Sequence, residues 1–550
     1  MAKTNPEEER VKSLFGVNKE IKKDIDPKHS VKCFNGVFVP RVEGDVSIFR
    51  GIPFAMPPIN ENRWKKPVPV EQSDKIFEAY FNGHSAIQTV IKSERASYYP
   101  QSEDCLYLNV WVNNSSEVKK KPIMVFIHGG SYGWGGTVDP LYDGYNFISL
   151  HKDVILITIA YRIGIFGFID FSSLEGGKNY PDAPNLGILD QIEALKYVKQ
   201  NGEAFGGDIN NVTIFGESAG GGSVSLLPLI KEAKGLFHRV IAESGSVALT
   251  YSKDECQILT QKLVEMTNVK NMEELSNLPI EKLIEVNKTL NDLNNFPMRD
   301  GKLIPIDPYD AYQKADIKDI DMLHGTNKHE MNYWIGELGG LFNYSYGMPI
   351  KFEYDLKKID EKDQAHVKEF MKSIHDSKIY KVSEFYNEIM FRLPAIKQCE
   401  AHSAKGGRTY MYYWRVKSKI PHFKACHAVE LAYVFNNPQE TIYIGEKGDE
   451  RLAKEVSTMW VNFAKTGDPS LPKVEWKRFD SENRYTMVIK KEEFEILSDP
   501  LREHRLMLEP ILPYLINPGY GNLSLNLPFL EGLKAFNDAL LGSIIFKIKE

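Results

Sequence analysis

Five short apolar segments, each ending in small or polar residues, constrain the fold of this chain more than any other feature of its sequence. Their apolar residues are nearly continuous rather than alternating, which is typical of strands buried on both faces of a sheet. The segments are 122–130 (PIMVFIHGG), 153–162 (DVILITIAYR), 211–218 (NVTIFGES), 239–246 (RVIAESGS) and 319–327 (DIDMLHGTN). Residues 189–207 lie between two of them and have helical spacing, with Ile192, Leu195 and Val198 on one face. This alternation predicts an α/β fold with a mostly parallel, twisted central sheet flanked by helices.

The chain shows no clear domain boundary. Residues 1–27 are charged throughout and predict a solvated tail or a short helix. Residues 28–550 are expected to form one domain, since 550 residues with 42% hydrophobic content suffice for a large core. Two segments rich in charged helix formers, about 251–295 and 352–405, predict helical excursions over the sheet and the rim of a pocket.

Composition argues against several classes of protein. The net charge of −6 provides no overall basic surface for nucleic acid. No apolar run reaches the roughly 18–20 residues that span a bilayer, and residues 1–26 lack the apolar core of a signal peptide. The five cysteines are widely spaced and odd in number, which favours neither a metal site nor a disulfide framework. We therefore predict a cytoplasmic protein without a membrane span; the sequence does not indicate its oligomeric state.

A serine stands where a buried strand is expected to end. Gly216-x-Ser218-x-Gly220 follows the run Val212–Phe215, and glycines allow the tight turn that exposes a nucleophilic serine between a strand and a helix. Ser218 would then begin the next helix, whose N–H groups favour a developing negative charge. The five-residue pattern also occurs by chance in many chains, but the preceding strand and the glycine-rich continuation favour a nucleophile.

A hydroxyl that attacks an ester also needs a base, a group that orients the base, and donors for the oxyanion. His128-Gly129-Gly130 closes an earlier strand, and its two glycines expose N–H groups as in the oxyanion motif that lies upstream of an elbow serine. A plain glycine-rich loop or a phosphate cradle are the alternatives. The cradle is less favoured because no Gly-Lys-Ser/Thr follows. His128 is expected to brace the loop rather than to act as the base.

Several further segments resemble the signature segments of one family, the type B carboxylesterases, which also includes the cholinesterases and bile-salt-activated lipase. They occur in the family's order between about residues 35 and 480. The segments are FRGIPFAMPP (49–58), SEDCLYLNVW (102–111), HGGSYGWGG (128–136), NLGILDQIEALKYVKQN (185–201), FGGDINNVTIFGESAGGGSV (205–224), AESGS (242–246) and WVNFAKTGDPS (460–470). The resemblance implies an α/β-hydrolase fold and hydrolysis of carboxylic esters through an acyl-serine, with no cofactor and no metal.

The resemblance also implies a Ser-His-Glu triad. Glu330 lies in LHGTNKHEMN (323–332), with Met331 where the family usually has glycine. His427 lies in KACHAVELAYVF (424–435), with Lys424 at another usual glycine. The order Ser218, Glu330, His427 is that of this fold. His427 would take the serine proton, and Glu330 would orient the imidazole and stabilise its charged form.

Other histidines compete less well for these roles. His422 lacks the downstream Glu-Leu-x-Tyr-Val-Phe context of His427. His324 and His329 flank the acid and raise the possibility of a metal, but without a carboxylate cluster nearby such histidines are usually ordinary hydrogen-bonded residues.

The expected oxyanion hole consists of the backbone N–H groups of Gly129, Gly130 and Ala219. Glu217 and Ser244 match positions close to the triad. Alternatively, Glu217 is simply a buried, hydrogen-bonded acid and Ser244 a cap at the end of a strand.

Two cysteines bear on the resemblance. Cys105 matches a residue that secretory members pair with a cysteine some thirty residues upstream, and the segment 76–90 contains no cysteine. We therefore expect this disulfide to be absent, which agrees with a cytoplasmic location. Cys426 lies next to His427, so thiol reagents could inhibit through it, although a small packed residue is the simpler interpretation.

The favoured hypothesis is a serine carboxylesterase acting on small or medium-sized uncharged esters. A non-catalytic binding protein on the same fold is less favoured because serine, acid and histidine are all retained. A cholinesterase-like enzyme needs an aromatic cage, for which Tyr132, Trp134, Tyr333 and Trp334 are candidates, but aromatics line apolar pockets generally. A lipase is not supported by any long amphipathic lid.

Overall fold

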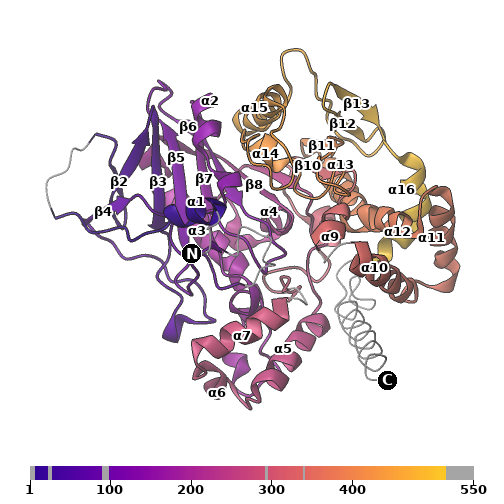
Figure 1. The fold of residues 1–550 in the computed structure, drawn as a ribbon, viewed down its shortest axis with the longest axis horizontal. Coiled ribbons are helices and arrows are strands. Elements are labelled where there is room, and N and C mark those ends of the chain that lie inside the picture. The colour runs from indigo at the N-terminus through magenta and orange to yellow at the C-terminus, as the bar shows by residue number, and fades with distance from the viewer. Residues whose placement is uncertain (1–5, 23–27, 89–97, 292–294, 338–340, 516–550) are drawn as a thin grey trace.

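A computed structural model describes residues 6–22, 28–88, 98–291, 295–337 and 341–515. One large sheet runs through the molecule, with helices packed against it (Figure 1). Its strands follow the order β1-β2-β3-β5-β7-β6-β8-β9-β10-β11-β12-β13, with β4 paired to β2. From β7 to β12 every neighbouring pair is parallel. The predicted α/β fold with a mostly parallel central sheet is confirmed.

The strands differ in length and place. Their bounds are β1 Val31–Cys33, β2 Gly36–Glu43, β3 Val46–Pro53, β4 Ile76–Ala79, β5 Tyr107–Asn113, β6 Lys121–Ile127, β7 Ile155–Ile159, β8 Gly207–Glu217, β9 Arg239–Glu243, β10 Asp321–Asn327, β11 Thr409–Trp414, β12 Tyr485–Ile489 and β13 Phe494–Ser498. The five apolar segments of the sequence form β6 to β10, the middle of the sheet. The carboxyl ends of β6, β8 and β10 therefore meet at one edge, where α/β folds bind ligands.

Alternating residues of the central strands enter different cores, because successive strand side chains point to opposite faces. In β6, Ile123 and Val125 join one buried cluster while Met124 and Phe126 join another. Both faces of the sheet are covered, which explains why these strands are apolar throughout rather than alternating. A few buried polar side chains, such as Thr213 in β8 and His324 in β10, interrupt these apolar runs.

The helices lie around this sheet and in two groups beyond it. Those of the first half are α1 Pro6–Ser13, α2 Tyr145–Leu150, α3 Leu186–Asn201, α4 Ala219–Leu226, α5 Lys253–Thr267, α6 Met272–Ser276, α7 Ile280–Asn291 and α8 Pro308–Lys314. Those of the second half are α9 Asn332–Glu337, α10 Leu341–Leu356, α11 Glu361–Ser373, α12 Lys378–Tyr386, α13 Leu393–Ala404, α14 Leu431–Val434, α15 Glu450–Thr466 and α16 Arg502–Leu508, with a π-helix at Asn387–Arg392. In Figure 1, α5 to α7 form the lower lobe, and α10 to α12 lie with α16 at the right.

Helices α5 to α7 lie within the segment 251–295, and α11 to α13 within 352–405, the two segments that the sequence marks as excursions; α10 begins before the second segment, at Leu341. The N-terminal segment holds α1. The division into a tail and one domain stays a prediction, and its residues 516–550 lie outside the described part of the chain.

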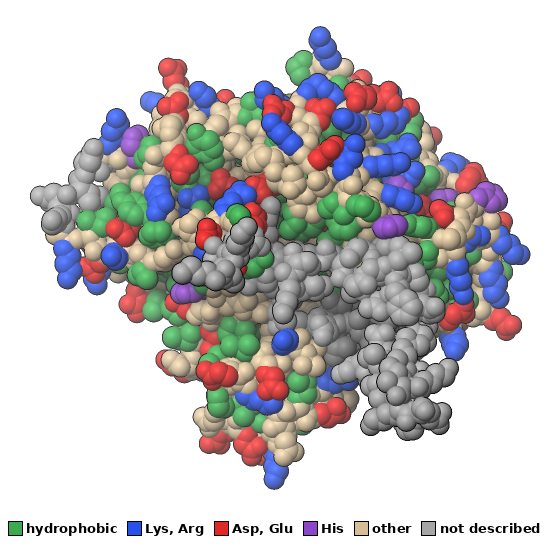
Figure 2. All heavy atoms as spheres, in the orientation of Figure 1, with side chains coloured by type: hydrophobic (Ala, Val, Ile, Leu, Met, Phe, Trp, Pro, Cys, Tyr) green, Lys and Arg blue, Asp and Glu red, His purple; other side chains and the backbone are tan. Residues whose placement is uncertain are grey.

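Three general properties of the structure bear on the expectations drawn from the composition. Within the described residues, no helix is long and apolar enough to cross a membrane. All five cysteines are free and buried, so Cys105 forms no disulfide. On the face shown in Figure 2, basic and acidic side chains are interspersed.

Candidate active site

Ser218 occupies a strained turn between β8 and α4. Its backbone has φ 57° and ψ −120°, a conformation that residues other than glycine rarely adopt. The turn needs its glycines: a Cβ on Gly216 would lie 2.6 Å from the Ile127 carbonyl oxygen, and one on Gly220 would overlap that oxygen. The backbone N–H of Ser218 donates to the Glu243 carbonyl at 2.9 Å. The strand-to-helix turn expected from the sequence is present, and Ser218 lines a cleft.

Glu330, which follows β10, and His427, which follows β11, form a buried pair. Glu330 Oε2 lies 2.7 Å from His427 Nδ1, and its Oε1 accepts hydrogen bonds from Asn327 N at 2.6 Å and Ser244 Oγ at 2.7 Å. Glu330 is fully buried and His427 is 5% exposed. A carboxylate on Nδ1 favours the tautomer that leaves Nε2 free to accept a proton.

The free nitrogen of His427 faces the cleft that Ser218 lines. Nε2 lies 3.1 Å from Glu217 Oε1, and among the described residues no hydrogen bond joins it to Ser218 Oγ. The rings of Trp334 and Phe391 stand 5.1 Å and 5.0 Å from the imidazole ring, between centroids. The sequence-predicted Ser218, Glu330, His427 and Glu217 are therefore brought together, and Ser244 contacts them through Glu330.

The glycine loop after β6 packs directly on the elbow. A Cβ on Gly129 would lie 2.8 Å from the Glu217 carbonyl oxygen and 3.1 Å from Ser218 Cβ. Gly130 has φ 104°, in the region that favours glycine. No acceptor among the described residues takes the N–H groups of Gly129 or Gly130. Ala219 is the first residue of α4, so its N–H has no acceptor within the helix.

His128 supports this glycine loop through its imidazole ring. Its Nδ1 lies 2.8 Å from the Gly129 carbonyl oxygen, and its ring stacks on Tyr161 with centroids 4.5 Å apart. Burial lowers the pKa of His128 to about 4. The imidazole is thus neutral at physiological pH and holds the loop rather than exchanging protons.

Two buried acids near the pair, Glu243 and Glu430, were not singled out from the sequence. Glu430 Oε2 accepts from Asn327 Nδ2 at 2.5 Å, and Glu243 Oε1 accepts from Trp460 Nε1 at 3.0 Å. Burial and the nearby Glu217 and Glu330 carboxylates raise the pKa of Glu430 to about 8. Burial also raises the pKa of Glu217 and Glu243 well above the usual value. The His-x-x-Glu spacing from His427 to Glu430 was the available signal; Glu243 had none beyond its strand end.

Aromatic side chains and two acids, Asp139 and Glu217, line the cleft. It contains about 580 Å³ of empty space, including space open to solvent. Besides Ser218, His427 and the glycine loop, its lining includes Tyr99, Trp134, Asp139, Tyr142, Tyr333, Trp334 and Tyr443. Of the proposed aromatic-cage residues, Trp134, Tyr333 and Trp334 line the cleft, whereas Tyr132 is fully buried and packs on Phe168 and Phe296.

A sequence model of the carboxylesterase family matches residues 35–507. The chain belongs to this family. The para-nitrobenzyl esterase of Bacillus subtilis is 34% identical over 485 residues, which cover 85% of this chain and 96% of that protein. Liver carboxylesterase 1F of Rattus norvegicus is 29% identical over 505 residues, covering 81% and 86% respectively.

Solved structures agree with these relatives. The Geobacillus stearothermophilus carboxylesterase EST55 at pH 6.2 has a TM-score of 0.77 at 30% identity, covering 87% of this chain and 99% of that one. A structure titled PNB esterase has a TM-score of 0.74 at 30% identity, with the same coverage. The protein is a carboxylic-ester hydrolase of the α/β-hydrolase fold, and the resemblance drawn from its sequence is confirmed.

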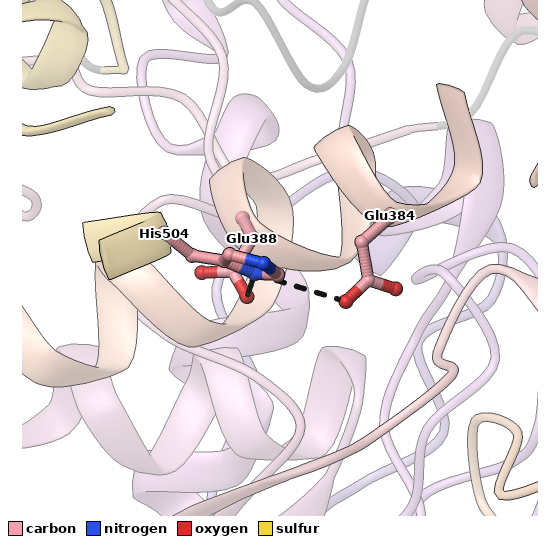
Figure 3. Close-up of side chains that lie close together, drawn as sticks. All are labelled: Glu384, Glu388 and His504. Atoms are coloured by element: carbon pink, nitrogen blue, oxygen red, sulfur yellow. Dashed lines mark ion pairs between the residues drawn. The ribbon is translucent and has the colours of Figure 1, made fainter. Parts of the chain in front are cut away.

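One group of side chains in this esterase has the spacing of metal ligands, within the described residues: Glu384, Glu388 and His504 (Figure 3). His504 Nδ1 lies 3.5 Å from Glu388 Oε1 and 3.9 Å from Glu384 Oε1. The guanidinium of Arg392 donates to both oxygens of Glu388, at 2.9 Å and 2.8 Å from Nε. This positive charge makes the group a network of ion pairs rather than a favourable cation site. The group does not include His324 or His329.

The thiol of Cys426 is inaccessible. Cys426 is fully buried, and burial, with Glu430 and Glu330 nearby, raises the pKa of its thiol well above the usual value. A reagent needs an accessible thiolate. The structure therefore contradicts the hypothesis of inhibition through Cys426 and agrees with a small packed residue.

Proposed function

We propose that this esterase hydrolyses small or medium-sized uncharged esters through an acyl intermediate on Ser218, with His427 as the base and Glu330 as the group that orients it. One observation carries the proposal: a strained serine, a buried carboxylate–imidazole pair and a loop with free N–H groups meet at a single cleft. Each feature has another explanation alone, but acyl transfer needs all three.

In the proposed reaction, Ser218 Oγ attacks the ester carbonyl carbon while His427 Nε2 removes the hydroxyl proton. The tetrahedral intermediate collapses, the bond to the alcohol oxygen breaks, and His427 returns the proton to the leaving alcohol. Water then attacks the acyl-serine with the same assistance and releases the acid. Glu330 stabilises the imidazolium in both steps, and hydrogen bonds from Ser244 Oγ and Asn327 N hold its carboxylate in place.

His427 Nε2 lies near Glu217 in this structure. Catalytic hydrogen bonds of a free enzyme are often long and tighten only around a substrate. Burial and the nearby Glu330 raise the pKa of Glu217 well above its usual value, which favours its neutral form. A neutral Glu217 adds no second charge that would compete with Glu330 for the imidazolium.

The N–H groups of Gly129, Gly130 and Ala219 would bind the oxyanion. Their support is that the two glycine N–H groups have no described acceptor, and that a Cβ on Gly129 would lie only 3.1 Å from Ser218 Cβ. Preorganised donors of this kind usually provide the largest single contribution to acyl-transfer catalysis. The reaction requires neither cofactor nor metal.

The aromatic lining favours uncharged esters with an apolar or aromatic portion. We further propose that residues 28–550 form one catalytic domain, of which 35–507 match the family. A cytoplasmic location is proposed on the five free cysteines.

The test is hydrolysis of p-nitrophenyl esters of increasing acyl length, and of a p-nitrobenzyl ester, by the wild type beside Ser218→Ala. We expect the best activity on short to medium acyl chains, and a loss of about 10⁴-fold or more in the variant, because triad members act as a unit. Equal activity of both proteins would rule out Ser218. A folded wild type that hydrolyses no ester would instead favour a non-catalytic binding role.

A further inference from the structure

The segment that carries Glu330 is held by an amide from a distant part of the chain. Asn387 Oδ1 accepts from the backbone N–H of Met331 at 2.9 Å, and its Nδ2 donates to the carbonyl of Lys328 at 3.4 Å. Asn387 therefore contacts the backbone on both sides of Glu330. It is 5% exposed and does not line the cleft. Asn387 therefore supports the segment and does not contact the substrate.

Asn387 is the first residue of the π-helix Asn387–Arg392, which separates α12 from α13. π-helices are rare and occur often at functional sites. The same short element supplies Phe391, whose ring centroid lies 5.0 Å from that of His427. One irregular turn thus contacts both members of the acid–histidine pair, Glu330 through its backbone neighbours and His427 through its ring.

The orientation of the Asn387 amide is fixed by its partners. Glu384 Oε2 accepts from Nδ2 at 3.0 Å, and a carboxylate and a carbonyl can only accept, whereas the Met331 N–H can only donate. The amide oxygen must therefore face Met331. The other oxygen of Glu384 faces His504 on α16, beside Glu388 (Figure 3). Glu388 in turn accepts hydrogen bonds from Arg392. This ion-pair network braces the carboxylate that orients the amide.

We infer that Asn387 is a positioning residue for the catalytic acid. By holding Lys328 and Met331, it keeps Glu330 Oε2 within 2.7 Å of His427 Nδ1. Small displacements of a supporting group lower the rate even when the residue is far from the reacting atoms. This inference rests on the proposed function, since it takes Glu330 to be the acid of the triad.

The experiment compares Asn387→Ala with a matched control, Asn287→Ala. Asn287 lies in α7, is fully buried, and makes the same two kinds of contact: its Oδ1 accepts from Ile165 N at 2.8 Å and its Nδ2 donates to Ile87 O at 3.4 Å. Asn387→Ala also removes the hydrogen bond to Glu384 Oε2, so it should lower the Tm at least as much as Asn287→Ala, and kcat is compared at a temperature where both variants are folded. We expect kcat for p-nitrophenyl butyrate to fall about 10- to 100-fold only in Asn387→Ala, with KM unchanged. Equal kcat values in the two variants would overturn the inference.

A double variant tests the same point without relying on the stability of Asn387→Ala. Asn387→Asp keeps the acceptor for Met331 but places two carboxylates together, so kcat should fall. Adding Glu384→Gln restores a donor–acceptor pair with the roles exchanged, so the part of the kcat loss that comes from the paired carboxylates should be recovered, while the bond to the Lys328 carbonyl stays lost. No recovery in a double variant that folds would contradict the inference.

The effect should also depend on Glu330. In the Glu330→Gln background, Asn387→Ala should cost little further activity, because both changes act on one group. An undiminished cost there would mean that Asn387 acts elsewhere. Failure of the two proposals is distinguishable: wild-type kcat in Glu330→Gln overturns the proposed acid, whereas a low kcat there with normal Asn387→Ala overturns only the positioning role.

Discussion

The two sides of the proposed site are held together in different ways. On the serine side, the strand, the strained turn and the helix are contiguous, and the glycine loop after the neighbouring strand packs on them. On the acid–histidine side, Glu330 and His427 are 97 residues apart. Their supports, Ser244 and Asn387, come from still other segments.

The difference shows that two kinds of interaction position one site. The serine side depends on backbone conformation, where an added methyl group collides with main-chain atoms. The acid–histidine side depends on individual side-chain hydrogen bonds, where loss of one acceptor or donor loosens the pair. The serine side should therefore be sensitive to added bulk, and the other side to removed polar groups.

The largest effect should follow removal of the base. His427→Ala should lower kcat by about 10⁴-fold or more, and Ser218→Ala combined with it should cost little more. His422→Ala is the matched control, since His422 is exposed and lies five residues upstream. It should retain activity within about twofold. If His422→Ala were the inactive variant in an initial-rate assay, the assignment of the base would be wrong.

A single methyl group on the glycine loop should have the next largest effect. Gly129→Ala places a Cβ 2.8 Å from the Glu217 carbonyl oxygen and 2.9 Å from its Oε2, so the loop must move. We expect kcat to fall by about two to three orders of magnitude, as when an oxyanion donor is lost. Gly406→Ala, whose Cβ meets nothing within 4 Å but whose φ of 82° disfavours alanine, controls for backbone strain remote from the cleft. A wild-type kcat in Gly129→Ala would contradict the oxyanion assignment.

Removing one hydrogen bond from the acid should have a smaller effect. Ser244→Ala deletes the 2.7 Å bond to Glu330 Oε1 while leaving the bond to His427. A hydrogen bond to a charged group contributes about 1.5–3 kcal/mol, so kcat should fall by about 10- to 100-fold. The control is Ser457→Ala, another fully buried serine whose Oγ donates to the Lys454 carbonyl within α15. A kcat loss that both variants share would mean a general effect of cavity formation.

The buried acids behind His427 should affect stability rather than rate. The pKa of Glu430 is raised from 4.5 to about 8, so the folded state binds a proton that the unfolded state has lost. Stability therefore falls as the pH rises between about 4.5 and 8, by up to about 1.4 kcal/mol per pH unit for one such group. Glu430→Gln should make the free energy of unfolding less dependent on pH. At pH 8 this variant should have a higher urea midpoint than the wild type. The free energy of unfolding of both proteins is measured by urea titration from pH 5 to pH 8. The same pH dependence in both proteins would contradict the raised pKa of Glu430.

The same contrast explains what the sequence could reveal. Local sequence patterns predicted the central strands, Ser218 and the loop of Gly129 and Gly130. Continuous apolar runs mark the strands, and obligatory glycines mark the turn and the loop. Glu330 and His427 were found through a resemblance to a family, although glycines usual near both are replaced by Met331 and Lys424.

Contacts between residues that are far apart in the sequence leave no such local pattern. Asn387 lies 56 residues from Met331, and nothing near it in the sequence distinguishes it from a surface amide on a helix. Glu243 is a buried acid at the end of β9, and its partner Trp460 lies 217 residues away. Because Cys426 is next to His427 in the sequence, we expected that thiol reagents could reach it. Its burial depends on tertiary packing, which this sequence neighbourhood does not indicate.

The most direct test of the central claim is covalent labelling of the nucleophile. Diethyl p-nitrophenyl phosphate transfers a phosphoryl group to an activated serine and releases p-nitrophenolate, and peptide mass mapping locates the group. We expect one diethylphosphoryl group per chain, on Ser218, and a loss of esterase activity in proportion to the labelled fraction. His427→Ala should be labelled much more slowly. A group on another residue that abolishes activity while Ser218 stays unmodified would contradict it.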